Sequence, residues 1–462
     1  MHIFDITILV SFLLVFTIYG LRQYKLNKTV EDYFLGGQNL PWYVAMFSIV
    51  ATETSVLTFI SVPGISYRSD WTFLQLALGY IFGRMIVAQF LLPMYYKNGI
   101  LSIYEVIGHK YGENIQKMAS GLFLITRLFA DGIRYLATAI IIHVITGWSI
   151  TIAVIIIGIC TLIYSITGGL KTIVWIDSFQ FLIYLTGGLI VIFLILHTIS
   201  IESVFNVLGY QSKLNIFNFS GNPIFSSMNF FSAFFGGAIF SLASHGTDYM
   251  MVQRCLSCKD LYSAKKALIG SGIFVFFQLG MFLFAGSLIY IYFDGVEIVK
   301  DREFTTFILE EVPIGLKGII LSGVLSAAMS TLSSSMNSLA SSTVIDWLKV
   351  KSNQIVKMRI ISVFWGIVLM LIALLFDEGD SAIVLIGFKI ASYTYGALLL
   401  LFMLVKTNLI KNNLSVIVGF LISILSVFLL DQFGIAWTWF VFFSTTIGFA
   451  ASSLVEIIFF RK

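Results

Sequence analysis

The sequence predicts an all-α polytopic membrane protein with about thirteen transmembrane helices, and three observations lead to this fold class. Of the 462 residues, 58% are hydrophobic and only 11% are charged, whereas soluble globular chains have about 45–50% apolar and about 25% charged residues. Long apolar runs recur along the whole chain, separated by short polar loops. The runs do not alternate in polarity as barrel strands do, and an open sheet cannot satisfy its backbone in lipid. A water-soluble enzyme is therefore excluded.

Thirteen apolar runs are each long enough to cross a bilayer, which takes about 20 residues in a helix. In chain order they lie near 4–21, 42–66, 72–94, 117–146, 149–167, 175–199, 227–252, 264–293, 315–345, 357–375, 380–405, 414–430 and 435–460. The first run has no basic leader and no small-residue cleavage site, so we expect a retained helix rather than a signal peptide.

The lysines and arginines predict the orientation of the chain. With the N-terminus outside, 19 of the 28 basic residues fall in cytoplasmic loops and 5 fall in outside loops. Cytoplasmic loops of membrane proteins carry an excess of Lys and Arg. We therefore expect a multi-pass protein of the cell (inner or plasma) membrane, with its N-terminus outside and its C-terminus in the cytoplasm.

Two spans contain stretches that favour an interrupted helix. Ser48–Ser55 in the second span places an acid, Glu53, at mid-depth, and Gly236–Gly246 in the seventh span is rich in small residues. The two spans are five helices apart, and a repeat of five helices must insert with opposite topology. Interrupted helices at matching positions of two inverted halves indicate a transport site at the bilayer midplane. The alternative is that the small residues only let helices pack closely.

The matching positions divide the chain into four parts. We expect the first five-helix repeat in residues 36–200 and the second, inverted repeat in residues 201–405. Residues 1–35 add one N-terminal helix with a cytoplasmic loop, and residues 406–462 add two C-terminal helices.

Several stretches of the chain resemble the sodium:solute symporter family. They are Phe34–Trp42, Tyr164–Gln180, Val252–Asp260, Ala327–Ser338 and Ser392–Gly396. The family includes carriers for sugars, proline, sialic acid, iodide, monocarboxylates and vitamins. The resemblance implies its fold, a LeuT-like 5+5 inverted repeat, and covers most of the chain.

The resemblance also implies a sodium site between two core helices. Carried over residue by residue, the site maps to Ala51, Thr54, Ala327, Ser330 and Thr331. Na⁺ needs about five or six hard oxygen ligands, and here the two alanines would give backbone carbonyls while Ser330 and Thr331 would give hydroxyls. The alternative for the hydroxyls is a hydrogen bond to the carbonyl four residues earlier in their own helix.

A second sodium ion, bound in some family members, would fall on Asp177, Ser333 and Ser334. For Asp177 the alternative is an acid at the lipid interface. A charge at mid-membrane costs about 2.5–3.5 kcal/mol on insertion scales, so Glu53 needs a role or a partner. We expect Glu53 to modulate sodium affinity; the alternatives are a protonated carboxyl within the bundle or a pair with Lys389.

Three charged residues on the fourth span bear on the solute. Arg127, Asp131 and Arg134 share one helical face because they are four and three residues apart. One Asp neutralises one Arg, and the positive charge that remains favours an anionic solute. Arg134 either holds a carboxylate bidentately or braces the bundle. Further candidate substrate residues around the cavity are Thr58, Phe59, Gln75, Ser241 and His245.

We therefore expect a sodium-coupled secondary active transporter, a symporter that imports a small organic solute by alternating access. An anionic solute such as sialic acid or another carboxylate is favoured over a sugar, an amino acid or a vitamin. Na⁺ is the expected coupling ion, without an organic cofactor. The expected partners are the solute and the bilayer, not nucleic acid, and the transport unit is expected to be a monomer. No catalytic constellation indicates an enzyme, whereas a transporter-like membrane sensor or a passive channel stays an alternative.

Overall fold

The computed structural model describes residues 2–25, 27–350, 354–375 and 383–460, and within these ranges the chain forms helices and no strand. The helices of the first part are α1 (Ile3–Arg22), α2 (Val30–Leu35), η1 (Gly36–Gln38), α3 (Trp42–Glu53), α4 (Val56–Arg68), α5 (Leu74–Phe90), α6 (Leu92–Asn98), α7 (Glu105–Tyr111), α8 (Glu113–Thr146), α9 (Ile150–Thr198) and α10 (Ile201–Tyr210). The later helices are α11 (Phe230–Gly246), α12 (Tyr249–Leu256), α13 (Leu261–Tyr292), α14 (Glu303–Glu310), α15 (Leu316–Ser342), η2 (Thr343–Trp347), α16 (Ile355–Leu375), α17 (Ile383–Thr407), α18 (Asn413–Gln432), η3 (Trp437–Trp439) and α19 (Phe440–Phe459).

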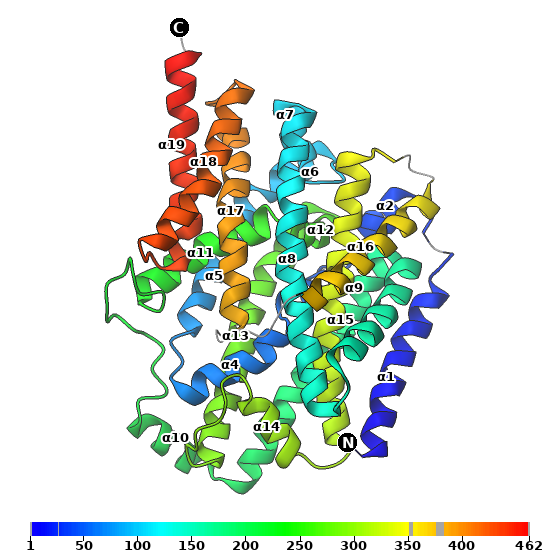
Figure 1. Ribbon diagram of the computed structural model, residues 1–462, viewed down its shortest axis with the longest axis vertical. Coiled ribbons are helices and arrows are strands. Elements are labelled where there is room, and N and C mark those ends of the chain that lie inside the picture. The colour runs from blue at the N-terminus through cyan, green and yellow to red at the C-terminus, as the bar shows by residue number, and fades with distance from the viewer. Residues whose placement is uncertain (1, 26, 351–353, 376–382, 461–462) are drawn as a thin grey trace.

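The predicted all-helical membrane fold is confirmed. Ten of the described helices are long and apolar enough to cross a membrane, or eleven when the bent pair α3 and α4 counts as one span. The start of the predicted span near 380–405, residues 380–382, lies outside the described residues. The two ends of the chain lie at opposite ends of the molecule (Figure 1). Helix α15 runs through the middle of the bundle, where nearly all its side chains are buried.

Helix α9 contains a kink between the two spans that the sequence predicts near 149–167 and 175–199. Its 49 residues lose the helical backbone at Gly169, where φ is 62° and ψ is −171°. A side chain at this position would strain the left-handed backbone, and a Cβ there would lie 2.8 Å from the carbonyl oxygen of Tyr33. Glycine therefore both allows the bend and lets the α2 segment pack into it.

Small residues bring α5 and α11 into backbone contact. A Cβ built on Gly79 would lie 2.2 Å from the carbonyl oxygen of Phe234, and one on Gly83 would lie 2.2 Å from that of Ala238. Close approach at glycine is the usual way in which membrane helices gain van der Waals contact. Some small residues of the predicted interrupted stretch thus also serve helix packing, since Gly237 lies against Leu76 in the same way.

Helix α1 is fixed to the bundle by a buried acid. Asp5 is fully buried, and its Oδ1 accepts hydrogen bonds from the backbone N–H groups of Gly315, at 2.7 Å, and Gly318, at 3.0 Å. A carboxylate at a helix N-terminus satisfies unpaired N–H groups and meets the positive end of the helix dipole. Asp5 thereby docks the first helix against the start of α15.

Candidate functional site

The second span is interrupted, as its sequence predicts. Helix α3 ends at Glu53, Thr54 and Ser55 take extended backbone angles, and α4 begins at Val56. The two helices are bent by 64° at this break. The last carbonyls of α3, from Ala51 onward, have no continuing helical turn to pair with. The break therefore turns backbone oxygens into possible ligands for a cation inside the bundle.

The seventh span is interrupted as well. Helix α11 ends at Gly246, and α12 begins at Tyr249 after Thr247 and Asp248. The small-residue stretch predicted to break thus ends at the break itself. The ninth span, in contrast, stays helical from Leu316 to Ser342 and carries its row of hydroxyl groups into the protein interior.

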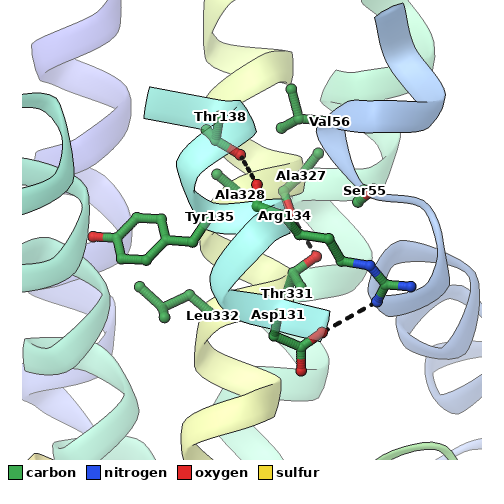
Figure 2. Close-up of a pocket in the computed structure, with 10 residues that line it drawn as sticks. All are labelled: Ser55, Val56, Asp131, Arg134, Tyr135, Thr138, Ala327, Ala328, Thr331 and Leu332. Carbon is green, nitrogen blue, oxygen red and sulfur yellow. Dashed lines mark hydrogen bonds and ion pairs between the residues drawn. The ribbon is translucent and has the colours of Figure 1, made fainter. Parts of the chain in front are cut away.

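The break between α3 and α4 lies against the hydroxyl-bearing face of α15. The Thr52 and Ser334 hydroxyls of the two elements are 3.2 Å apart. A narrow cavity of about 10 Å³, lined by Ser55, Ala327 and Thr331 among others, separates the break from α15, which is room for about one water molecule. Figure 2 shows these residues around the cavity.

The five residues of the predicted sodium site lie in different environments. The Ser330 hydroxyl is buried beside the Asp177 carboxylate and makes no hydrogen bond of good geometry among the described residues. Thr331 donates to the Ala327 carbonyl at 3.0 Å, which is the bond within the helix that the sequence left open. Thr54 donates to Gln278 Oε1 of α13 at 3.1 Å, so its side chain turns away from α15. Ser330 is the hydroxyl of the set that lies next to a buried carboxylate, that of Asp177.

Asp177 lies in the interior and not at a lipid interface. It is fully buried, its Oδ2 accepts a hydrogen bond from the Ser48 hydroxyl at 2.7 Å, and its Oδ1 has no partner among the described residues. Arg254 Nη2 lies 3.3 Å from Oδ2 and also donates to the Ser334 hydroxyl. Ser333 instead donates to the Ser330 carbonyl at 3.1 Å.

Arg254 is a site residue that the sequence did not reveal. Its position beside a run of loop cations placed it among the cytoplasmic basic residues, but the structure buries it completely on α12. Its guanidinium lies between Asp177 and Ser334, two of the three residues expected to bind a second sodium ion. The Val252–Asp260 motif pointed to this segment, and only the packing of α12 against α3 and α15 shows what Arg254 contacts.

Glu53 is ion-paired within the bundle. Its carboxylate pairs with Arg84 of α5, and His245 Nε2 of α11 lies 3.5 Å from the same oxygen. Arg84 also donates to the Ser271 hydroxyl at 2.6 Å. The pair with Lys389 weighed from the sequence does not form, because Lys389 pairs with Asp431 at 2.8 Å. Glu53 thereby joins the ends of both interrupted spans through His245.

The charged face of α8 forms as predicted, but its charge balance differs from the expectation. Asp131 Oδ1 lies 3.4 Å from Arg127 and 3.2 Å from Arg134. Arg127 has a second acidic partner, since its Nε donates to Asp248 at 2.7 Å, and it also donates to the Tyr395 hydroxyl at 2.7 Å. Two arginines therefore face two aspartates, and the surplus positive charge inferred from the sequence is wrong.

Arg134 is the arginine of this group that reaches the cavity. Its side chain extends from α8 toward the unwound segment that carries Ser55, with one guanidinium nitrogen paired to Asp131 (Figure 2). It is also more exposed than Arg127, at 12% against 2% of the side chain. The N–H groups of Arg134 that are not paired with Asp131 can therefore reach the cavity. The group of two arginines and two aspartates as a whole carries no net charge.

The other candidate substrate residues do not line this cavity. Phe59 packs edge-on against Phe282 and Phe304. Gln75 donates to two backbone carbonyls and accepts from Asn218. Phe59 and Gln75 thus contact other parts of the protein in the way that residues with a structural role do.

The polar candidates near Glu53 are also engaged or buried. Ser241 donates to the Tyr80 carbonyl at 3.1 Å, and His245 Nδ1 lies 2.9 Å from the Ser244 hydroxyl. Thr58 is buried on α4 near the break. Of the six candidates, Arg134 lines the cavity beside Ser55 and the other five do not.

Comparison with known proteins identifies the family. The sequence profile of the sodium:solute symporter family matches residues 33–408. The chain belongs to this family. Its fold is similar to that of a substrate-bound, outward-open Na⁺-coupled sialic acid symporter, with a TM-score of 0.88 and 23% identity over 99% of this chain and 98% of that one. It also matches Mhp1, a nucleobase-cation-symport-1 family transporter in a closed conformation, with a TM-score of 0.59 and 15% identity over 93% of each chain.

Curated family members share about a quarter of the residues. Human sodium-coupled monocarboxylate transporter 2 is 28% identical over 72% of this chain and 55% of its own length. The sodium/sialic acid symporter SiaT of Proteus mirabilis is 27% identical over 72% of this chain and 69% of its own. The chain thus spans about half the length of the first of these relatives. The family and these relatives are transporters and not enzymes.

Proposed function

We propose that this chain is a sodium-coupled symporter that imports a small organic anion by alternating access. The observation that carries the proposal is the break between α3 and α4, which lies across a narrow cavity from Ala327 and Thr331 of α15. The next hydroxyl of the same helix, Ser330, is buried beside the Asp177 carboxylate. Buried oxygens that lack donors cost free energy unless something binds them. A dehydrated Na⁺ bound at this site is the positively charged partner that these oxygens lack.

The proposed topology has thirteen spans with a 5+5 core. Helix α9 has 49 residues, about 74 Å at 1.5 Å per residue, more than twice the roughly 30 Å core of a bilayer; its bend at Gly169 divides it into two spans. With the pairs α3–α4 and α11–α12 each counted as one span, the total is thirteen. An odd total agrees with chain ends at opposite ends of the molecule (Figure 1).

The repeats occupy residues 36–200 and 201–405 in this proposal, with residues 1–35 and 406–462 as additions at either end. The interruptions at Thr54 and Thr247 fall at matching places in the two halves. The excess of Lys and Arg in one set of loops places the N-terminus outside and the C-terminus in the cytoplasm. The transport unit in this proposal is one chain.

The proposed sodium site combines the carbonyls of Ala51 and Ala327 with the oxygens of Thr54, Ser330 and Thr331. To bind the ion through their hydroxyls, Thr331 must turn from the Ala327 carbonyl and Thr54 must turn from Gln278, while Ser330 must face the ion from beside Asp177. Sodium bound here joins α3 to α15 and stabilises the conformation in which the solute site is formed. A ligand shifts a conformational equilibrium only by its difference in affinity for the two states, and this bridge provides such a difference.

Sodium supplies the driving force for uptake. Each Na⁺ that enters contributes about 2.3 kcal/mol per 100 mV of membrane potential, in addition to its concentration gradient. Release of the ion into the low-sodium cytoplasm removes the bridge between the two helices, which resets the carrier. Glu53, next to the site and held by Arg84, adds negative charge that raises sodium affinity.

In this proposal the Arg254 side chain, rather than a second sodium ion, occupies the position between Asp177 and Ser334. The Arg254 guanidinium lies between Asp177 and Ser334, where a second sodium would be bound, so a second ion enters only when Arg254 moves. One sodium per cycle is therefore the stoichiometry that the arrangement favours.

The proposed solute is an anion whose carboxylate binds Arg134. The guanidinium faces the cavity beside the sodium site (Figure 2), and its planar donors match a carboxylate bidentately. The relatives named above carry monocarboxylates and sialic acid, and both solutes are carboxylates. The cavity holds about one water molecule in this arrangement, so the proposed solute enters only after α4 or α8 moves away from α15. Thr58, Ser241 and His245 then border the enlarged site, while Phe59 and Gln75 support its wall.

A panel of labelled solutes tests this proposal. Purified protein in liposomes with an inward sodium gradient is supplied with lactate, sialic acid, proline and glucose. We expect a carboxylate to accumulate, and we expect Arg134→Gln to reduce its uptake by about tenfold or more, as loss of a charge-assisted bidentate pair requires. Arg22→Gln, at an exposed position on α1, is the matched control. Accumulation of glucose alone, or full carboxylate uptake by the Arg134 variant, contradicts the proposal.

A further inference from the structure

A second polar pocket lies where the end of α1 meets the bend of α9, and it is lined by other residues than the cavity beside Ser55. Its volume is about 360 Å³, within the range of about 300–1,000 Å³ typical of small-ligand sites. The lining side chains that matter here are Tyr19 of α1, Asp32 of α2, and Lys171 and Trp175 of α9. The transport mechanism uses none of them.

The walls of this pocket are held by hydrogen bonds at the bend. Asn27 Nδ2 donates to the Thr167 carbonyl at 3.4 Å, and the Tyr33 hydroxyl donates to the Ile166 carbonyl at 3.2 Å. Both carbonyls precede Gly169, where the helix no longer provides their usual partners. The α1–α2 connection is thus fixed to α9, and the pocket between them has a defined shape.

The pocket carries one positive and one negative charge. Lys171 is exposed and forms no ion pair with any described residue. The Asp32 carboxylate accepts hydrogen bonds from the backbone N–H groups of Lys28 and Thr29, both at 3.1 Å, through Oδ2 alone. Its Oδ1 lies against Gly37, which also lines the pocket. An ammonium donor and a carboxylate acceptor are therefore both available to a ligand.

Apolar surface continues from the pocket along both helices. Trp175 stacks on Phe179, with ring centroids 6.3 Å apart, and Phe179 is 52% exposed. On α1, one turn from Tyr19, Val15 is 61% exposed. Trp and Tyr beside charged groups, with exposed apolar side chains one turn deeper, are the pattern of a membrane–water interface. A ligand with a polar head and apolar chains fits both the polar pocket and the apolar surface beside it.

We propose that this pocket binds the headgroup of a phospholipid with a zwitterionic phosphoethanolamine head. Lys171 binds the phosphate, Asp32 accepts hydrogen bonds from the primary ammonium, and the acyl chains lie along α1 and α9. A headgroup with only negative charge would be repelled by the Asp32 carboxylate. A choline headgroup presents no N–H donor to that carboxylate, so it binds more weakly.

Lipid titration of the purified full-length protein, followed by native mass spectrometry, tests this assignment. Short-chain phosphatidylethanolamine, phosphatidylcholine and phosphatidylglycerol are compared, together with free phosphoethanolamine. We expect phosphatidylethanolamine to bind about tenfold more tightly than phosphatidylcholine, since a hydrogen bond to a charged group contributes that much. Asp32→Asn should remove most of this difference, whereas Lys171→Gln should weaken the binding of both lipids, because both carry the phosphate that Lys171 binds.

Lys25→Gln is the matched control, because Lys25 is an exposed lysine of the same connection that does not line the pocket. It should bind phosphatidylethanolamine as the unmodified protein does. Equal binding of the ethanolamine and choline lipids overturns the proposal, as does preference for phosphatidylglycerol, which would indicate an anionic headgroup site. Equally tight binding of free phosphoethanolamine overturns the lipid assignment. Lys171 is exposed, so its variant is expected to fold, and its melting temperature verifies this.

Discussion

Replacing Ser330 by alanine removes one oxygen ligand of the proposed sodium site. The hydroxyl is buried beside the Asp177 carboxylate, so the melting temperature of the variant is measured together with its sodium affinity. Interactions of a hydroxyl with a charged group contribute about 1.5–3 kcal/mol, and about 1.4 kcal/mol corresponds to a factor of ten in affinity. We therefore expect sodium affinity to fall about 10- to 100-fold.

Binding of radioactive sodium to purified protein measures this change directly and needs no knowledge of the solute. Ser326→Ala is the control, because Ser326 lies one turn earlier on α15, is equally buried, and donates to the Ser322 carbonyl at 2.7 Å. Its sodium affinity should be unchanged. Equal sodium affinities of the two variants would refute the assignment of Ser330 as a ligand.

Three further substitutions test the contacts that hold the site. Glu53→Gln leaves the buried Arg84 without its acid, which should cost about 3–5 kcal/mol of unfolding free energy; the double variant with Arg84→Met should recover part of it in a denaturation assay. Asp5→Ala removes the cap of α15 and should lower the unfolding free energy by about 0.5–2 kcal/mol, whereas Asp5→Asn should lower it less. Gly83→Ala places a methyl group 2.2 Å from an α11 carbonyl and should sharply reduce folded protein in size-exclusion chromatography, while Gly280→Ala, which meets no atom within 4 Å, should not.

Each of these outcomes has a result that contradicts it. If Glu53→Gln leaves the unfolding free energy unchanged, the ion pair with Arg84 makes no net contribution to stability. Equal melting temperatures of Asp5→Ala and the unmodified protein would show that α1 docks without its acid. Equal yields of the two glycine variants would show that α5 and α11 can separate without cost.

The sequence predicts those features of the site that depend on neighbours within one helix. The cluster of small and polar residues before Ser55 indicates a break that the structure confirms. The spacing of Arg127, Asp131 and Arg134 fixes their common face, because helical periodicity alone decides it. Hydrophobic length likewise predicts the spans, and the two spans within α9 meet at a kink at Gly169 rather than at a long polar loop.

The partners of the buried charges could not be predicted, because they lie far away in the chain. Arg84 is 31 residues from Glu53, and Asp248 is 121 residues from Arg127. Without Asp248 the charge of the α8 cluster cannot be counted correctly. The same holds for Arg254, whose acid Asp177 is 77 residues away. Such pairs depend on which helices pack together, which local sequence patterns do not specify.

Sodium dependence of uptake in liposomes tests the central claim most directly. Purified protein is reconstituted, and accumulation of the carboxylate identified by the solute panel is measured from sodium, potassium and choline media at equal osmolarity and membrane potential. The account predicts accumulation above the external concentration only from sodium medium, with a higher sodium requirement in Ser330→Ala. Equal accumulation from potassium or choline medium would contradict it.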